Sequence, residues 1–430
     1  MAAPLHKQPV SPVDTQRPRS RFVFGEGFRA LRNRNFRLFW SGQLISQIGT
    51  WMQTTAQAWL VLEITGSPFA LGFVSTLQFL PFTLLSLFGG LIADRFPKRG
   101  LLLVTQILGL IQAALFATLV LTGAIQLWHI YVLAVFQGIT NAIDNPVRQA
   151  IAVEVVGKED LINAVGLNSV QFNVARIVGP ALAGVLIARI GTAPALFFNA
   201  ASFLAAIVGL ALMNPGEFRD VPERPTGRPL QQLREGLAYA LHTPIVLLAL
   251  MVVAFIGTFG YNFNTVLPLL AKFVLNTDAE GFGLLTAAFG FGSLVGAFRT
   301  AVTSKVSVRR LLLASASFSV ILALLAAAPY FAAAVLLLVA LGYAGVTFGT
   351  TANSLVQLNV PDELRGRVMS LYVLLFIGST PIGAFLTGTL SDRIGVRPTL
   401  LVCAVLCAIG VAVALMFWQR NRPRSEGQAR

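Results

Sequence analysis

The most informative stretch of this chain is Gly89-Gly-Leu-Ile-Ala-Asp-Arg-Phe-Pro-Lys-Arg99. A long apolar run ends here in small residues, an acid, three bases and a proline follow, and the apolar run resumes at Leu101. Charges packed this closely between two bilayer-length segments indicate a short loop at a membrane surface. Gly90 precedes Asp94 by one helical turn, so both lie on one helix face, and the glycine lets another helix pack closely there.

The composition predicts an integral membrane protein. Of the 430 residues, 55% are hydrophobic and 12% charged, about half the charge of a soluble domain. The net charge of +14 does not indicate nucleic-acid binding, because the bases lie between apolar runs rather than on one soluble domain. Cys403 and Cys407 are one helical turn apart in an apolar run, so we expect no disulfide framework, metal site or cofactor.

Twelve apolar runs are each long enough to cross about 30 Å of hydrocarbon as an α-helix. They lie at 36–62, 68–93, 101–122, 128–150, 163–188, 194–213, 244–268, 281–303, 309–328, 331–355, 368–390 and 398–418. Twelve crossings place both termini on one side, and that side receives 27 of the 32 Lys and Arg residues. The positive-inside rule therefore predicts cytoplasmic termini in a multi-pass protein of the cell (inner) membrane.

The two halves of the chain repeat each other. An offset of 204 residues aligns 156–196 with 360–400 and gives 13 identities in 41 positions, including Arg-Ile-Gly-x-x-Pro-x-Leu twice. An offset of six helices preserves orientation, so the sequence predicts an all-α fold of two parallel six-helix repeats. The expected division is a tail with an amphipathic lead-in (1–35), the first half (36–213), a cytoplasmic linker with a surface helix (214–243), the second half (244–418) and a cytoplasmic tail (419–430).

Polar side chains recur at helical spacing on the first, fourth, seventh and tenth runs. Lipid penalises such stripes, so they should face protein or a water-filled cavity; for any single residue, hydrogen bonding between helices is the simpler alternative. The expected cavity residues are Gln43, Gln47, Gln57, Asn141, Asn173, Arg176, Asn262, Asn264, Tyr343 and Thr347.

Charge inside the runs is rare. Asp144 is the only carboxylate deep within a run, with Arg148 one turn later, and Arg176 is the only charge in the fifth run. Asp144 is the interior acid available to carry a proton, or a structural partner of Arg148, Arg95 or Arg99. Arg176 is a substrate-binding candidate or a hydrogen-bonded strut between helices. The expected cytoplasmic gate comprises Gly90, Asp94, Arg95, Lys98, Arg99, Asp144 and Arg148.

Several motifs resemble the major facilitator superfamily. The loop Gly90-x-x-x-Asp94-Arg95 with Lys98-Arg99 is similar to the family's loop between helices 2 and 3. A branch containing the enterobactin exporter and macrolide-efflux proteins resembles this chain over about 30–400. That likeness rests on Arg32-Asn-Arg-Asn-Phe-Arg37, Gly49-Thr-Trp-Met-Gln53, Ala56-Gln-Ala-Trp-Leu60, Asp144-Asn-Pro-Val-Arg-Gln149, Arg176-Ile-Val-Gly-Pro180 and Val360-Pro-Asp-Glu-Leu-Arg-Gly-Arg367.

The resemblance implies a monomeric secondary exporter of small amphipathic molecules of drug, macrolide or siderophore type, driven by proton antiport through alternating access. It also implies that Asp94 meets the start of helix 11 in the closed gate. An importer or uniporter of a small polar solute would have the same fold, and a non-transporting receptor or scaffold is the alternative of another class. We expect no enzyme, because the chain has three histidines and lacks the His-Glu-x-x-His, Gly-x-Ser-x-Gly and P-loop motifs.

Overall fold

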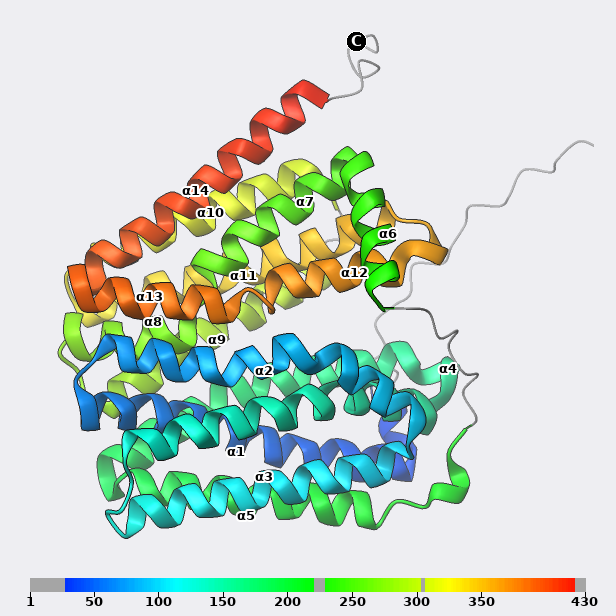
Figure 1. Ribbon diagram of the computed structural model, residues 1–430, viewed down its shortest axis with the longest axis vertical. Coiled ribbons are helices and arrows are strands. Elements are labelled where there is room, and N and C mark those ends of the chain that lie inside the picture. Colours follow the sequence, from blue (N-terminus) through cyan, green and yellow to red (C-terminus); the bar gives the residue numbers. More distant parts are fainter. Residues whose placement is uncertain (1–27, 220–228, 303–305, 422–430) are drawn as a thin grey trace, which may run out of the picture.

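The computed structural model describes residues 28–219, 229–302 and 306–421, except for the side chains of 86–88, 90–91, 93–94, 158, 229–233 and 301. Much of the expected tails and part of the expected linker therefore lie outside the described residues. Within the described part every regular element is a helix (Figure 1). The first half contains η1 (Arg29–Arg32), α1 (Arg34–Thr65), α2 (Pro68–Arg95), α3 (Lys98–Leu121), α4 (Leu127–Ile190) and α5 (Thr192–Ala211).

The connecting segment contains η2 (Pro215–Glu217) and α6 (Pro229–His242). The second half comprises α7 (Pro244–Phe255), η3 (Ile256–Gly260), α8 (Phe263–Leu269), η4 (Leu270–Val274), α9 (Ala279–Val302), α10 (Val308–Ala326), α11 (Phe331–Leu358), α12 (Asp362–Phe376), α13 (Thr380–Ile394) and α14 (Val396–Asn421). Figure 1 shows the halves as two helical bundles, one above the other, with α14 inclined to the helices of the lower bundle. We call the end of the bundle where α1 begins and α14 ends the terminal side, and the opposite end the distal side.

Ten stretches of the described chain are long and apolar enough to cross a membrane. The other two of the twelve expected crossings are α1 and the first limb of α4 (127–156), whose polar stripes lower their hydropathy. The expected crossings at 128–150 and 163–188 are the two limbs of α4, which meet at a kink where Gly157 has a φ of +71°. This left-handed conformation favours glycine, which has no Cβ to clash. The second limb (158–190) then returns to the distal side.

Two crossings predicted as continuous helices are interrupted. The seventh changes to a π-helical turn at η3 and breaks at Tyr261 and Asn262 before α8 begins. The eleventh is divided into α12 and α13 around Ile377–Ser379. The two breaks are neighbours, since the rings of Tyr261 and Phe376 lie 5.1 Å apart. Irregular backbone at membrane depth is tolerated where protein or a cavity surrounds it.

The two halves touch each other mainly toward the distal side, where α2 packs against α13 and the second limb of α4 packs against α9. Glycines permit this approach: a Cβ on Gly72 would lie 2.7 Å from the Cα of Gly388, and one on Gly184 would lie 3.1 Å from the Cα of Gly283. Polar contacts at the same end include the Lys272 ammonium, which donates to the Leu62 carbonyl at 2.6 Å.

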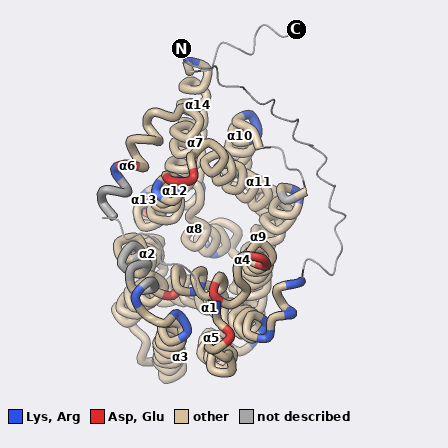
Figure 2. The backbone as a smooth tube through the Cα atoms, turned by 90° about the vertical axis from the view of Figure 1, so that its right-hand side faces the viewer, with Lys and Arg blue, Asp and Glu red and all other residues tan. Residues whose placement is uncertain are grey.

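The helix α6 lies on the terminal side, beside α12 (Figure 2). The Tyr239 hydroxyl donates to the Asn359 carbonyl at 2.9 Å, and Glu235 forms an ion pair with Arg367. Leu237 and Leu241 on α6 are exposed. The expected surface helix thus docks on the second half and keeps two apolar side chains outward, an arrangement that suits a helix at a membrane surface.

Candidate functional site

A cavity of about 1010 Å³ lies between the two halves. Its wall includes Arg148, Gln149, Asn353 and Ser354 toward the terminal side, whereas the contacts between α2 and α13 and between α4 and α9 occupy the distal side. The space is therefore on the terminal side of the inter-half contacts, the face seen in Figure 2. A volume of this size is at the upper end of the range for small-molecule sites.

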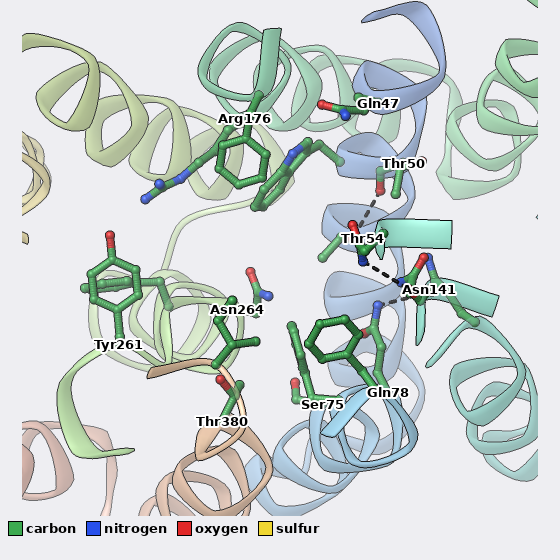
Figure 3. Close-up of a pocket in the computed structure, with 18 of the residues that line it drawn as sticks. Gln47, Thr50, Thr54, Ser75, Gln78, Asn141, Arg176, Tyr261, Asn264 and Thr380 are labelled. Atoms are coloured by element: carbon green, nitrogen blue, oxygen red, sulfur yellow. Dashed lines mark hydrogen bonds between the residues drawn. The ribbon is translucent and has the colours of Figure 1, made fainter. Parts of the chain in front are cut away.

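Polar side chains from both halves form part of the wall (Figure 3). The Thr50 and Thr54 hydroxyls donate to carbonyls one turn earlier in α1, at 2.9 and 3.0 Å. The Gln78 amide of α2 donates to the Gln137 side chain of α4 at 3.1 Å. Further polar wall residues are Ser46, Gln47, Thr140, Asn141, Asn145, Ser169, Asn173, Asn262, Asn264, Thr265, Thr350, Asn353, Ser354 and Thr380.

Twelve aromatic rings also line the wall. They come from helices on which the sequence showed no polar stripe as well as from those that have one. They are Trp51, Phe79, Phe82, Phe136, Phe172, Phe203, Tyr261, Phe263, Phe282, Phe289, Tyr372 and Phe376. Rings bury large apolar areas and accept varied partners. The sequence did not single out these residues, because a phenylalanine in an apolar run can face lipid, a cavity or the inside of a bundle.

Asp144 is 3% exposed and sits at the centre of a hydrogen-bonded cluster on the wall. One carboxylate oxygen accepts from the Thr105 hydroxyl at 2.7 Å and from the Gln106 amide at 2.9 Å. The other oxygen pairs with Arg148, one helical turn later. Of the partners that the sequence left open, the structure therefore selects Arg148 and adds two neutral donors from α3.

Two other expected gate residues, Lys98 and Arg99, have partners other than Asp144. Lys98 forms an ion pair with Glu154 at 2.9 Å. Arg99 donates to the Leu210 and Ala211 carbonyls at 2.7 and 2.9 Å, at the end of α5 where a helix leaves carbonyls unpaired. Arg95 is exposed, and neither the surroundings of Gly90 nor the Asp94 side chain belongs to the described part of the structure. The expected link from Arg95 or Arg99 to Asp144 is absent among the described contacts.

Six of the ten expected cavity residues lie on the wall: Gln47, Asn141, Asn173, Arg176, Asn262 and Asn264. The structure places the other four away from it. Gln43 and Gln57 are 1% and 3% exposed and face packing within the bundle. The ring of Tyr343 lies under the side chain of Arg299 on α9, and the guanidinium carbon of Arg299 is 5.8 Å from the ring centroid. Thr347 is buried.

The reason for the difference on α11 is the helix phase. The wall there consists of Gly345, Val346, Gly349, Thr350, Asn353 and Ser354. Thr347, on the neighbouring face, points into helix packing instead, and its buried hydroxyl has no hydrogen-bond partner among the described residues. A polar stripe therefore identifies which helix lines the cavity. It gives the side of that helix that faces the cavity only to within about one residue.

A family model described as "Transmembrane secretion effector" matches residues 26–428 of the chain. Among curated proteins, the chain is similar to the staphyloferrin A transporter of Staphylococcus aureus strain NCTC 8325 / PS 47, with 28% identity over 89% of this chain and 96% of that one. It is also similar to the multidrug efflux pump Tap of Mycolicibacterium fortuitum, with 26% identity over 87% of this chain and 93% of that one. The macrolide efflux protein A of Streptococcus pyogenes is 23% identical over 86% of this chain and 95% of its own length.

Solved structures of the same fold include an inward-facing, unoccupied bacterial homolog of the human lysosomal transporter Spinster, with a TM-score of 0.69, 15% identity and coverage of 90% of this chain and 97% of that one. A D-xylose-proton symporter matches with a TM-score of 0.65 at 15% identity, covering 92% and 97%. Together with the two six-helix halves, these findings define a transmembrane transporter of the major facilitator superfamily rather than an enzyme. Within that class, the chain belongs to the transmembrane secretion effector family.

Proposed function

We propose that this transporter exports small amphipathic molecules from the cytoplasm by alternating access, in exchange for protons. The observation that carries the proposal is the composition of the cavity, where twelve aromatic rings alternate with amide and hydroxyl groups. Such a wall binds apolar bodies of varied shape and orients them through a few polar contacts. The relatives include two efflux proteins and a siderophore transporter, which supports the same substrate range of drug, macrolide or siderophore type.

In this proposal the terminal side faces the cytoplasm. Support comes from the charges, because of the Lys and Arg residues in the described part of the chain the distal side carries only Arg189, Lys272, Arg393 and Arg397. The described conformation would then be open to the cytoplasm and ready to load. Rocking of the halves about the cavity would close the terminal side and separate the glycine contacts on the distal side, which releases the substrate outward.

Asp144 is the carboxylate among the described wall residues, and we assign the proton step to it. A proton taken up by this group would cancel the charge that Arg148 now pairs with and free the arginine to move. Proton binding to Asp144 and release of Arg148 would then be coupled to the opening of the terminal end of the cavity, where both residues lie.

The test is accumulation of a dye panel in cells with and without the protein, each with and without an uncoupler. The panel contains anionic, neutral and cationic fluorescent dyes of similar size. We expect lower accumulation of at least one dye, and we expect the uncoupler to abolish the difference. Equal accumulation of every dye in both strains, or faster inward uptake, would refute export.

A matched pair of variants confines the effect to the cavity. A Cβ on Gly349 would meet only the tip of the Phe376 ring at 3.9 Å, so Gly349→Trp places an indole in the cavity. Gly100 near the start of α3 has open space around it and is exposed, and tryptophan is favoured at a membrane interface. Gly349→Trp should lose export, whereas Gly100→Trp should keep it.

A further inference from the structure

The cavity wall contains one charged side chain that has no counter-ion among the described residues. Three charged residues line the cavity: Asp144, Arg148 and Arg176. The first two pair with each other. Within the described part of the chain, no carboxylate lies within ion-pair distance of the Arg176 guanidinium. The described wall therefore carries a net positive charge at Arg176.

Arg176 is held in place by packing rather than by an ion pair. Arg176 is 9% exposed, and its guanidinium carbon lies 4.5 Å from the centre of the Phe289 ring. That ring also contacts Tyr261 edge-on, with 6.2 Å between centroids. Arg176 belongs to the first half, while Phe289 and Tyr261 belong to the second. Figure 3 shows Arg176 and Tyr261 on the same part of the cavity margin, opposite Thr50 and Asn141.

The energetics favour an anionic ligand at this point. Removing a guanidinium from water is costly at membrane depth, and the face of an aromatic ring recovers only part of that cost. A guanidinium presents N–H donors in a planar fork that matches the oxygens of a carboxylate, sulfonate or phosphate. The Tyr261 hydroxyl on the same ring cluster is a neutral hydrogen-bond donor, and the surrounding phenylalanines suit an apolar body.

We propose that Arg176 is the anion-recognition site of the cavity, so that the preferred substrates are amphipathic molecules carrying an oxyanion group. This inference rests on the proposed function and narrows its substrate class. The oxyanion lies on the Arg176 guanidinium, and the apolar part of the molecule lies against Phe289 and the neighbouring rings. Lipophilic cations bind poorly, because the same guanidinium repels them.

The test uses two probes that share one aromatic scaffold. 8-Anilinonaphthalene-1-sulfonate is anionic, and N-phenyl-1-naphthylamine is the same molecule without the sulfonate. Each is titrated by fluorescence into the full-length protein in lipid nanodiscs, with empty nanodiscs subtracted. We expect the wild type to prefer the sulfonate, and Gly349→Trp to weaken specific binding of both probes because its indole takes up part of the cavity.

Arg176→Gln keeps a hydrogen-bonding group and removes the charge. We expect it to weaken sulfonate binding about tenfold or more, as for a hydrogen bond to a charged group, and to change binding of the neutral probe by less than about twofold. Arg176→Lys should retain part of the preference, because the charge remains and the fork is lost. Arg189→Gln is the matched control, since Arg189 lies on the same helix, is exposed and is outside the cavity wall; it should change neither affinity.

An unchanged ratio of the two affinities in Arg176→Gln overturns the inference, and so does a wild type that does not prefer the sulfonate. The two proposals fail in different assays. Uncoupler-sensitive export confined to neutral or cationic dyes would overturn anion recognition and leave export standing. Arg176-dependent sulfonate binding without any export from cells would overturn the proposed function and leave the anion site standing.

Discussion

The glycine contacts between α2 and α13 make the balance between the two access states open to experiment. A Cβ on Gly72 would lie 2.6 Å from the Ala384 carbonyl oxygen and 2.7 Å from the Cα of Gly388. Ordinary contact between non-bonded carbons needs about 3.5 Å, so Gly72→Ala forces the two helices apart by roughly 0.8 Å. Both obstructing atoms are backbone, so no side chain can turn away to relieve the clash.

The expected size of the effect follows from the cost of overpacking. Forcing an extra methyl group into a close-packed contact costs about 1–3 kcal/mol. The cost falls only on the described conformation, in which the distal side is closed, and it shifts the ratio of the two states about 5- to 150-fold toward the distal-open one. Alanine also raises helix propensity relative to glycine, but that gain of about 1 kcal/mol is the same in both states and does not affect the ratio.

The assay is a pair of distance measurements between spin labels. Labels at Thr122→Cys and Tyr330→Cys report separation of the halves on the distal side, and labels at Ile162→Cys and Leu358→Cys report it on the terminal side; all four positions are exposed. The native cysteines are buried and are replaced by serine in every variant. Gly72→Ala should lengthen the distal distances and shorten the terminal ones.

Two comparisons make the result specific to the contact. A Cβ on Gly283 would lie 2.6 Å from the Pro180 carbonyl oxygen at the other glycine contact, so Gly283→Ala should shift both distances in the same direction as Gly72→Ala. Gly100→Ala meets no atom within 4 Å and should leave both distances at their wild-type values. Unchanged distances in Gly72→Ala, or an equal change in Gly100→Ala, would refute the reasoning that these glycines set the balance.

Two further predictions concern the proton step and the orientation. Asp144→Asn keeps the shape of the side chain and removes the charge that pairs with Arg148. In membrane vesicles this variant should lose export driven by a pH gradient and keep exchange of labelled for unlabelled substrate. Glu154→Gln is the control, because it removes a carboxylate outside the cavity. A fall in exchange as well, together with a lower melting temperature, would show a structural role instead. A cysteine at Gly216, on the terminal side, should be labelled by an impermeant maleimide only after the cells are opened. A cysteine at Thr122, on the distal side, should be labelled already in intact cells. The reverse pattern would place the terminal side outside the cell.

The spans could be read from the sequence because lipid allows so few solutions. In hydrocarbon every backbone polar group must be paired within its own segment, so a long apolar run is a helix and its length fixes the crossing. The same constraint made Asp144 and Arg176 visible as rare interior charges, and both lie on the cavity wall. The interruptions at Tyr261 and at Ile377 were not predicted, because the apolar runs on the two sides of each break together have the length of one crossing. In the structure the rings of Tyr261 and Phe376 bring the two breaks into contact.

The sequence by itself determined that the chain crosses the membrane as two related sets of helices, and that the first, fourth, seventh and tenth runs carry the polar stripes. Tertiary structure decided which residues of each stripe meet the cavity: on α11, Thr350 and Ser354 of the stripe line it, whereas Thr347 is buried away from it. It also decided that Asp144 joins Thr105, Gln106 and Arg148. The physical reason is that a polar or aromatic side chain is stable wherever neighbouring helices offer it a partner, and those partners are far away in the sequence.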